Sequence, residues 1–392
     1  EVVAESTGAA VREAPTYEVT LVRSASALRE HLAGWDALCR EALEPNVFYE
    51  PWMLLPALDC YARGEELAIA LVHEREGGRP PRLCGLFPFA RLPRYQGLPI
   101  PVLSLWSHPH CYVRTPLVHE GCAEAVLQAL FDFLAASPDG APMVELAGVS
   151  ADGPFHAAFL EHLRATGRLT FQVEAWSRAL LRPAASADAY LDAVLSSTRR
   201  RKLRRAERLL AERGAVEFAS LAEGENPDPW IEDFLALEAA GWKGREGTAL
   251  ASREEDRRFF TEAARGAAAR RQLVFRSLRV GGRNVAMLCN FVSGSGAFAF
   301  KVAFDEAFAQ ASPGALLELE DIRRTHEQGG LRWIDSCTAP GAPLMNALWR
   351  DRRMLQTSLV ETGRATGKLV VSLLPLLRLV RRTTAALAAR PR

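Results

Sequence analysis

The sequence is poor in the features that mark a disulfide scaffold, a zinc ribbon or a membrane span. Its seven cysteines are odd in number, scattered and without a C-x-x-C pair, which argues against the first two. No run approaches the roughly 20 apolar residues that cross a bilayer. The first fifteen residues lack the charged-then-apolar arrangement of a secretory signal. We therefore expect a cytoplasmic protein.

A large excess of one charge is also missing. The formal net charge is +1, so the overall balance indicates no partner, and a basic site must come from local clustering. The segment SHPHCYV gathers His108, His110 and Cys111, but its proline and the lack of a second ligand cluster favour a structured loop over a metal site. We predict no metal.

The 392 residues are 48% hydrophobic and 24% charged, which is typical of a globular protein with two or three domains. Segments 67–92 and 273–294 each have the pattern of two strands joined by a Gly-Gly-Arg turn. This repetition indicates a duplicated module. Helical patterns surround both. The order predicts an α+β (mixed α/β) protein whose sheets are mostly antiparallel.

The segment 298–322 raises a specific expectation of a binding site. Its strand alternates bulky apolar residues with alanines and Lys301, so we expect the lysine on a second face that forms a cleft wall. Ser312 is a good helix N-cap, Pro313 suits the first helical position, and Gly314 has no side chain to block a ligand. A strand followed by an accessible helix N-terminus can hold phosphate or another anion.

A second candidate is the run TRRRKLRR, which concentrates positive charge within two helical turns. Its cations are Arg199, Arg200, Arg201, Lys202, Arg204 and Arg205. Phosphates of a cofactor, nucleic acid and an acidic lipid surface could neutralise them. The alternative is a solvated helix face, partly relieved by Glu207 and Glu212. We expect this helix to end at Gly214.

Two further positions carry chemistry. GWKGREGTAL places Trp242 and Lys243 among glycines, which fits either a ligand-binding loop or a surface turn with a buried tryptophan. Asp335 ends the strand in LRWIDSC, where an apolar wall could raise its pKa towards that of a useful base. A structural aspartate that binds the following turn fits equally well.

Several segments together resemble one family: STRRRKLRRAERLLAERG at 197–214, EAAGWKGREGTAL at 238–250 and FKVAFDEAFAQASPG at 300–314, with GLRWIDSC and WRDRR downstream. They are similar to acetyltransferases associated with bacterial cellulose biosynthesis, the CelD/BcsL-like group, within the GNAT and FemAB-like superfamily. The strong match spans about 190–355. The first half matches loosely through FYEPWML, GLFPFAR and SHPHCYVRTPLV.

The resemblance implies tandem GNAT-like (FemAB-like) domains that face each other across a cleft. We place a degenerate domain on the acceptor side at 1–189, the acyltransferase domain at 190–367 and a basic amphipathic tail at 368–392. The implied activity is acyl transfer from a thioester, such as acyl-CoA as co-substrate, to an amine or hydroxyl of a small molecule or saccharide. Envelope or exopolysaccharide metabolism is the implied setting. In the tail, Leu and Val are interspersed among Arg378, Arg381 and Arg382, so we expect it either to lie on an acidic membrane surface, at the inner face of the membrane, or to pack on the protein without spanning.

In GNAT enzymes a splayed strand grips the pantetheine arm and the next helix N-terminus binds pyrophosphate. By similarity, the donor-side residues are Phe300, Val302, Ser312, Pro313, Gly314 and Ala315, and we add Arg200 and Arg204 from the basic run. The usual Q/R-x-x-G-x-G/A is replaced by one glycine and a proline without an N–H. An acyl carrier protein and aminoacyl-tRNA therefore stay open as donors.

The predicted reaction is direct attack in a ternary complex, which needs a base and groups that polarise the carbonyl. The predicted catalytic residues are Asp335, Lys301, Lys243 and Glu238, the last as a reserve base. The predicted substrate-binding residues are Trp242, Asp305, Trp349 and Arg353. Cys337 offers a rival covalent route. The histidines offer no clear base.

Two other functions compete with an acyltransferase. One is a FemAB-type ligase that depends on aminoacyl-tRNA, which RNase would inactivate. The other is a protein without catalysis that scaffolds a membrane polysaccharide synthase, which would bind no thioester.

Overall fold

The computed structural model describes residues 14–388, with side chains as far as residue 376. Its strands are β1 (Thr16–Val22), β2 (Leu67–Arg75), β3 (Arg82–Leu92), β4 (Val102–Leu105), β5 (Leu117–Val118), β6 (Met143–Ser150), β7 (Thr170–Leu181), β8 (Val216–Ser220), β9 (Leu273–Val280), β10 (Arg283–Ser293), β11 (Gly296–Phe304), β12 (Trp333–Asp335) and β13 (Asp351–Glu361). All thirteen strands belong to one sheet, so the chain does not form two separate sheets.

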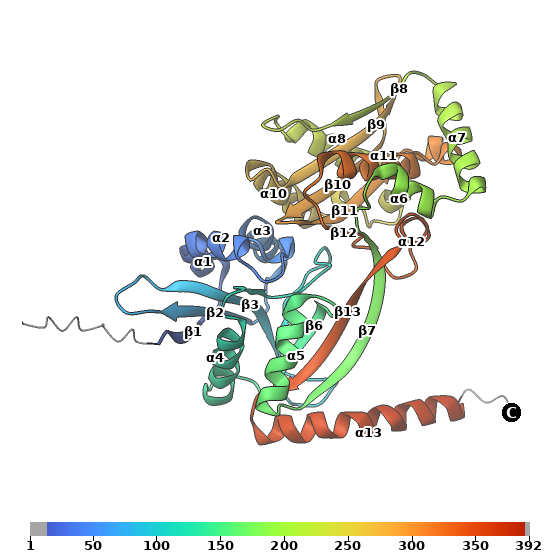
Figure 1. Ribbon diagram of the computed structural model, residues 1–392. Coiled ribbons are helices and arrows are strands. Elements are labelled where there is room, and N and C mark those ends of the chain that lie inside the picture. The colour runs from blue at the N-terminus through green and yellow to red at the C-terminus, as the bar shows by residue number, and fades with distance from the viewer. Residues whose placement is uncertain (1–13, 389–392) are drawn as a thin grey trace, which may run out of the picture.

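Helices cover this sheet on both faces (Figure 1). In the first half they are α1 (Ala25–Leu28), α2 (Leu32–Arg40), α3 (Pro51–Tyr61), α4 (Ala123–Ala136) and α5 (Pro154–Thr166). In the second half they are α6 (Ala187–Val194), α7 (Ser197–Ala211), α8 (Asp228–Ala240), α9 (Trp242–Arg245), α10 (Glu254–Ala269), α11 (Pro313–Gln328), α12 (Pro343–Leu348) and α13 (Ala365–Ala388). A 3₁₀ segment, η4 (Glu306–Ala311), leads into α11.

The two halves repeat one order of elements. The first runs β2-β3-β4-α4-β6-α5-β7, with the two-residue strand β5 inserted before α4, and the second runs β9-β10-β11-α11-β12-α12-β13. Both predicted hairpins form as antiparallel pairs, β2 with β3 and β9 with β10. In each half the third strand pairs in parallel with the strand after the next helix. The predicted fold class, mixed α/β with a mostly antiparallel sheet in tandem GNAT-like halves, is confirmed.

The halves exchange their last strands. The sheet order is β1-β2-β3-β4-β6-β13-β7-β12-β11-β10-β9-β8, so β7 of the first half lies beside β12 of the second. Conversely, β13 lies between β6 and β7. Figure 1 shows β7 and β13 as two long strands that run together from the lower to the upper half. Each half therefore completes the sheet of the other.

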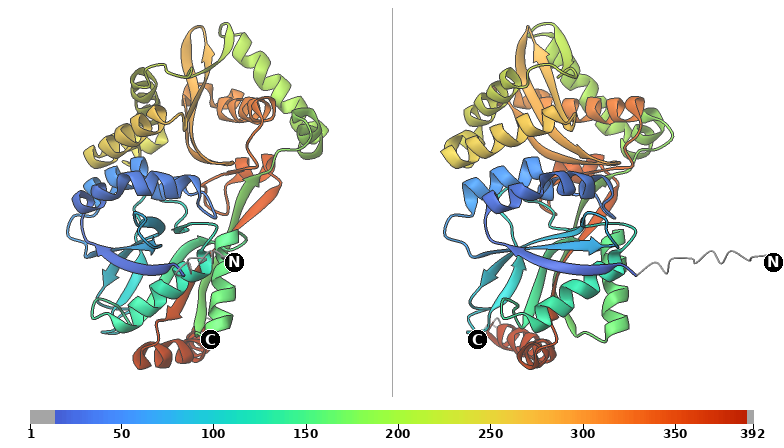
Figure 2. Two further views of the ribbon diagram at one scale, coloured as in Figure 1. Left: turned by 60° about the vertical axis from the view of Figure 1, so that its left-hand side comes forward. Right: turned by 90° about the vertical axis from the view of Figure 1, so that its left-hand side faces the viewer.

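An apolar cluster joins the halves away from the sheet. The rings of Phe48 and Phe298 meet at 5.4 Å, and those of Trp52 and Phe291 at 5.2 Å. Helix α3 of the first half packs on α10 of the second, and both views in Figure 2 place these helices between the halves. Separation of the halves would expose this surface to water.

One local prediction needs correction. The expected single helix ending at Gly214 is two helices, α6 and α7, divided at Leu195, and the second ends at Ala211. The break follows from Ser196, whose hydroxyl accepts a hydrogen bond from the Arg199 N–H and starts a new helix. Among residues 14–388, no helix is long and apolar enough to cross a membrane.

Candidate active site

Strands β11 and β12 separate after Asp335. They pair in parallel over only three positions, the last of which joins Phe298 to Asp335. β11 then continues to Phe304, whereas the chain after β12 turns away into the loop 336–342. Residues 299–304 thus have no β12 residue opposite them. The two strands therefore diverge in the segment where the resemblance implies a splayed strand.

A β-bulge in β11 interrupts the predicted alternation of side chains between the two faces of this strand. Cys289 of β10 pairs with Lys301, but the next residue, Asn290, pairs with Ala299, so Phe300 is an extra residue. A bulge of this kind turns the strand and re-aims its side chains. As a result, Phe300 packs in the cluster between the halves, while the residues at 302 and 304 pack on the opposite face.

The N-terminus of α11 follows the end of β11 and is open. Pro313 is its first residue, and a Cβ added at Gly314 would meet only a Phe304 carbon, at 3.8 Å. Ser312 holds the N-cap position as predicted, but its side chain makes no capping hydrogen bond. Its left-handed backbone, with a φ of 45°, differs from the extended conformation of capping residues.

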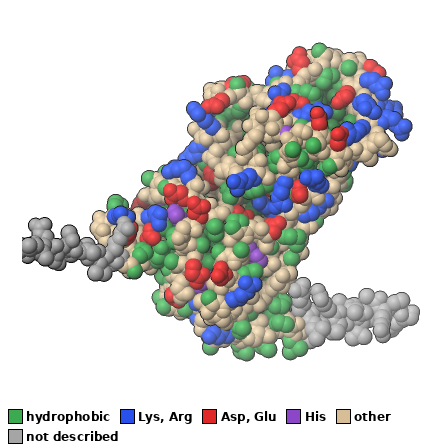
Figure 3. All heavy atoms as spheres, viewed as in Figure 1, with side chains coloured by type: hydrophobic (Ala, Val, Ile, Leu, Met, Phe, Trp, Pro, Cys, Tyr) green, Lys and Arg blue, Asp and Glu red, His purple; other side chains and the backbone are tan. Residues whose placement is uncertain are grey.

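Helix α7, which carries the basic run, packs against η4 and α11. Arg200 is occupied: its guanidinium binds the carbonyls of Leu191 and Leu195 and the carboxylate of Asp192. Other cations of α7 are exposed and have no carboxylate partner among residues 14–388; they are Arg201, Lys202, Arg204 and Arg205. Figure 3 shows the resulting basic surface at the upper right of the molecule.

Three of the predicted catalytic residues meet on the face of β11 that looks towards the first half. Glu238 of α8 is 2% exposed, and its Oε1 atom accepts a hydrogen bond from Lys243 Nζ at 2.8 Å. Lys301 Nζ lies 3.8 Å from the same oxygen. Burial lowers the pKa of Lys301, although the charge of Glu238 opposes this shift. The two lysines therefore share one buried carboxylate.

His110 approaches this cluster from the first half. Its Nε2 atom lies 3.1 Å from Asp256 Oδ1, and Tyr61 donates its hydroxyl proton to the same oxygen at 2.6 Å. Its ring stacks on Phe259 at 5.6 Å. Burial, and then the charge of Lys301, lower the pKa of His110. The imidazole is therefore neutral near pH 7 and able to accept a proton.

No local pattern predicts a role for His110, because 146 positions separate it from Asp256. The only signal was its place in SHPHCYV, a segment in which two histidines follow a strand. His108 from the same segment is also buried, stacked on Tyr61 at 5.0 Å, and its Nε2 atom has no partner. The loop that contains His108 and His110 therefore places aromatic and imidazole rings at the boundary between the halves.

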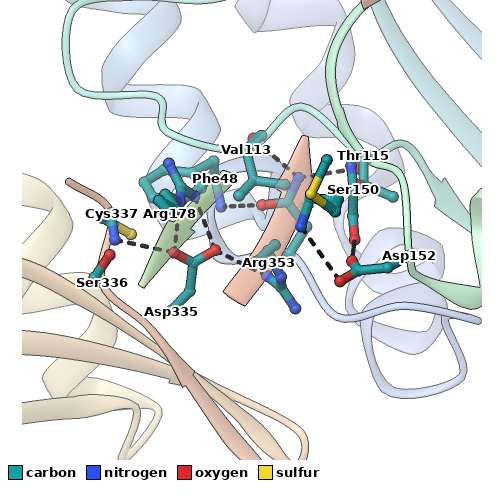
Figure 4. Close-up of polar contacts among 12 residues, drawn as sticks. Phe48, Val113, Thr115, Ser150, Asp152, Arg178, Asp335, Ser336, Cys337 and Arg353 are labelled. Atoms are coloured by element: carbon teal, nitrogen blue, oxygen red, sulfur yellow. Dashed lines mark hydrogen bonds and ion pairs between the residues drawn. The ribbon is translucent and has the colours of Figure 1, made fainter. Parts of the chain in front are cut away.

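Asp335 does not have the properties expected of a base. Its carboxylate is fully buried, 2.6 Å from Arg178 Nε and 3.0 Å from Arg353 NH1, and accepts the Cys337 N–H (Figure 4). Burial would raise the pKa of Asp335, but the charges of Arg178 and Arg353 outweigh burial and lower it. The predicted rise in pKa is wrong. A buried carboxylate held by two cations is a structural centre of the sheet.

Cys337, the rival nucleophile, lies beside this ion pair. It is 7% exposed, and burial together with the charge of Asp335 raises the pKa of its thiol well above the usual range. A nucleophilic cysteine needs a thiolate, which this setting disfavours. The burial of Cys337 and the raised pKa of its thiol therefore disfavour a covalent acyl-enzyme intermediate.

The predicted substrate-binding residues are dispersed. Trp349 is buried and donates to Glu318, and Arg353 is held by Asp335, so neither faces a ligand. Asp305 accepts the Ala307 N–H as the N-cap of η4. Only Trp242 directs a largely exposed side chain outward, at 46% exposure, and it belongs to the short helix α9 where we expected a loop.

In the part of the chain that the structure describes, no group of three or more histidine, cysteine or acidic residues could hold a metal ion. The remaining donor-side residues lie where the strand and the helix meet. Val302 offers its carbonyl to Lys243 Nζ at 3.3 Å, and Ala315 lies in the first turn of α11.

Comparison with known proteins supports the fold. Residues 197–342 match the family model described as an acetyltransferase (GNAT) domain. The chain matches no curated protein. It is similar to the crystal structure of FemX, with a TM-score of 0.55 and 10% identity over 90% of this chain and 100% of that one. It is also similar to a conserved protein of unknown function from Bacteroides thetaiotaomicron VPI-5482, with a TM-score of 0.50 and 14% identity over 84% of this chain and 97% of that one. The match to the GNAT domain contains β11, the N-terminus of α11 and the residues Glu238, Lys243 and Lys301.

Proposed function

We propose that this protein is an acyltransferase that moves an acyl group from acyl-CoA to an amine or hydroxyl. The observation that carries the proposal is the divergence of β11 and β12 next to the open N-terminus of α11, inside the matched segment. The acyl thioester would lie along residues 299–304 of β11. Its phosphates would meet the amides of α11 and the exposed cations of α7.

His110 is the base in this proposal, in place of Asp335. A carboxylate can only accept, so the contact with Asp256 makes Nε2 the donor and leaves Nδ1 as the acceptor of the neutral ring. An aspartate also orients the basic histidine of Ser-His-Asp triads, where it binds Nδ1–H and leaves Nε2 as the base. The low pKa of His110 keeps the ring unprotonated before the reaction.

The reaction then needs no covalent enzyme intermediate. The acceptor nitrogen or oxygen attacks the thioester carbonyl carbon while its proton passes to His110 Nδ1. The C–S bond breaks, and the thiolate leaves with a proton returned from the medium or from the imidazolium. In this proposal Lys301 stabilises negative charge on the carbonyl oxygen; the burial of its ammonium and the carboxylate of Glu238 that it shares with Lys243 support this role.

The acceptor and the biological setting are proposals from the resemblance alone. A saccharide acceptor in envelope or exopolysaccharide metabolism follows from the similarity to the CelD/BcsL-like group. A second candidate is transfer from aminoacyl-tRNA, which the exposed cations Arg201, Lys202, Arg204 and Arg205 of α7 favour because they lack carboxylate partners among the described residues. Treatment with RNase separates the two: only the second would lose activity.

Two variants test the donor site and the base separately. We expect Gly314→Val to fold, because its added carbon has room, but to lose donor affinity as the side chain covers the helix N-terminus. His110→Asn should bind the donor normally and slow acyl transfer by about 10²- to 10⁴-fold. Calorimetry with acetyl-CoA measures binding, and release of free thiol measures transfer.

Gly77→Val is the matched control, since Gly77 lies between β2 and β3 with nothing within 4 Å of an added carbon. It should bind acetyl-CoA as the parent protein does. If the parent, Gly314→Val and Gly77→Val proteins bind acetyl-CoA with equal affinity, the donor does not bind at the N-terminus of α11. An unchanged rate of acyl transfer in His110→Asn would show that His110 is not the base.

A further inference from the structure

Exposed leucines gather at one end of the molecule, far from the candidate active site. Among the described side chains, nine large hydrophobic residues are exposed. Six of them belong to this end: Leu92, Leu98, Leu169, Leu369, Leu373 and Leu376. Single exposed apolar side chains are common, but a group of this kind marks an interaction surface.

The sheet register places these residues along one edge of the fold. Leu92 pairs with Val102, which pairs with Met143, which in turn pairs with Glu361. The Glu361 N–H donates to the carbonyl of Leu169. The row crosses β3, β4, β6 and β13 and ends just before β7, so all these strand ends face the same way. Helix α13 follows β13 at this end (Figures 1 and 2).

Helix α13 carries apolar residues on two opposite faces. Its inner face packs Val370, Val371 and Leu374 against the body, in a cluster that includes Tyr95 and Val102. The outer face carries three leucines at i, i+4 and i+7, which share one side of a helix. Their exposures are 62% for Leu369, 44% for Leu373 and 58% for Leu376. The inner face already anchors the helix, so folding does not require the outer leucines.

Two cations accompany the leucines. Arg94, between Leu92 and Leu98, and Lys368, next to Leu369, are exposed and have no ion pair among residues 14–376, whose side chains the structure describes. Nearby cations are engaged: Arg364 binds the carbonyls of Leu134 and Ser137. The nearby acids Asp139 and Asp132 pair with Arg23 and Arg168. The uncompensated charge beside the leucines is therefore positive.

We infer that this end of the protein rests on the surface of a bilayer that contains anionic phospholipid. The leucines enter the boundary between headgroups and acyl chains, and Arg94 and Lys368 meet lipid phosphates. A second copy of this chain is a poorer occupant, because a two-fold interface would bring the same unpaired cations together. The inference does not depend on the proposed acyl transfer.

Sedimentation of the full chain with vesicles tests this surface. We expect binding to vesicles of phosphatidylcholine with phosphatidylglycerol, and weaker binding in high salt. The triple variant Leu369→Ser, Leu373→Ser, Leu376→Ser should bind at least about tenfold more weakly, since each buried leucine contributes substantially to partitioning. Phe218→Ser is the matched control, because Phe218 is exposed by 39% on β8 of the other half and should bind normally.

The double variant Arg94→Glu, Lys368→Glu separates charge from apolar contact. It should lose binding to anionic vesicles and bind phosphatidylcholine vesicles as the parent does. Equal sedimentation of the parent and the triple variant would overturn the inference, as would equal loss in Phe218→Ser. A dimer seen without lipid and abolished by the triple variant would assign the surface to a second copy instead. Circular dichroism confirms that each variant is folded.

Discussion

At the scale of single residues, the charges of His110 and Lys301 are linked. The lysine disfavours the imidazolium and helps to lower the pKa of His110. Lys301→Met keeps most of the side-chain volume and removes the charge. We therefore expect it to raise the pKa of His110, which NMR of the imidazole measures and which the acid limb of the pH–rate profile should repeat.

Lys243→Met is the control for this prediction. Lys243 shares Glu238 with Lys301, but it is not among the charges that shift the pKa of His110. It should leave the titration of the imidazole close to that of the parent. A pKa of His110 that stays unchanged in Lys301→Met would show that the two groups are not coupled, and the role given to Lys301 would fail.

Asp335 leads to a prediction of a different kind, about stability. Asp335→Asn leaves the buried guanidinium groups of Arg178 and Arg353 without their counter-charge, and such breaks cost about 3–5 kcal/mol. We expect the free energy of unfolding in urea to fall by this amount near neutral pH. A stable but inactive variant would return Asp335 to the role of base.

The pH dependence of this effect has a definite sign. The pKa of Asp335 is lowered in the folded state from an ordinary value of 3.8, so its contribution is present above that value. It is lost as the pH falls through the lower, folded pKa. The difference in stability between the parent and Asp335→Asn should therefore shrink below about pH 4.

These residues show what local sequence patterns can predict. Glu238, Lys243 and Lys301 lie in segments with recognisable motifs, and the structure brings them together. His110 and Arg178 come from the other half of the fold, so no spacing along the chain connects them with Asp256 and Asp335. Whether a carboxyl acts as a base or as a structural ion is determined more by its charged neighbours than by its position at the end of a strand.

At the scale of elements, periodicity predicted the hairpins and the strand–helix unit of β11 and α11. It could not predict the bulge at Phe300, because the extra residue is defined by its pairing with β10. The bulge explains why Lys301 is buried near Glu238 and His110. Without it, Lys301 would alternate with Phe300 and face away from the first half.

Helix α7 illustrates the same limit. Its charge run is evident in the sequence, but its packing beside η4 and α11 is a tertiary fact. That packing brings the charged helix next to the segment that leads into α11, which the composition alone does not reveal. Arg204 is exposed, whereas Arg200 stabilises the end of α6.

At the scale of the whole molecule, the exchange of β7 and β13 determines how the chain folds. The proposed boundaries at 189 and 367 separate the repeats in sequence, but each repeat ends in a strand that the other repeat holds. Thr170 and Leu359, which share a hydrogen bond, are 189 positions apart. The sequence showed the duplication, and only the long-range pairing shows that the repeats are interlocked.

We therefore predict that the two repeats do not fold separately. In the fragment 1–189, β7 has lost β13 and no longer reaches β6. In the fragment 190–392, β13 has lost both of its neighbours, and both fragments expose the apolar cluster between the halves. Expressed alone, each should aggregate or unfold without a cooperative transition, because strand edges and apolar surface remain open.

Co-expression provides the test of this interlocking. The two fragments should assemble into a 1:1 complex that melts in one transition somewhat below that of the intact chain, since the missing peptide bond lies in the first turn of helix α6 and leaves every strand intact. Size-exclusion chromatography with light scattering and calorimetry measure both properties. If either fragment alone melts cooperatively as a monomer, the boundary at 189 separates true folding units, and the exchanged strands contribute little to their stability.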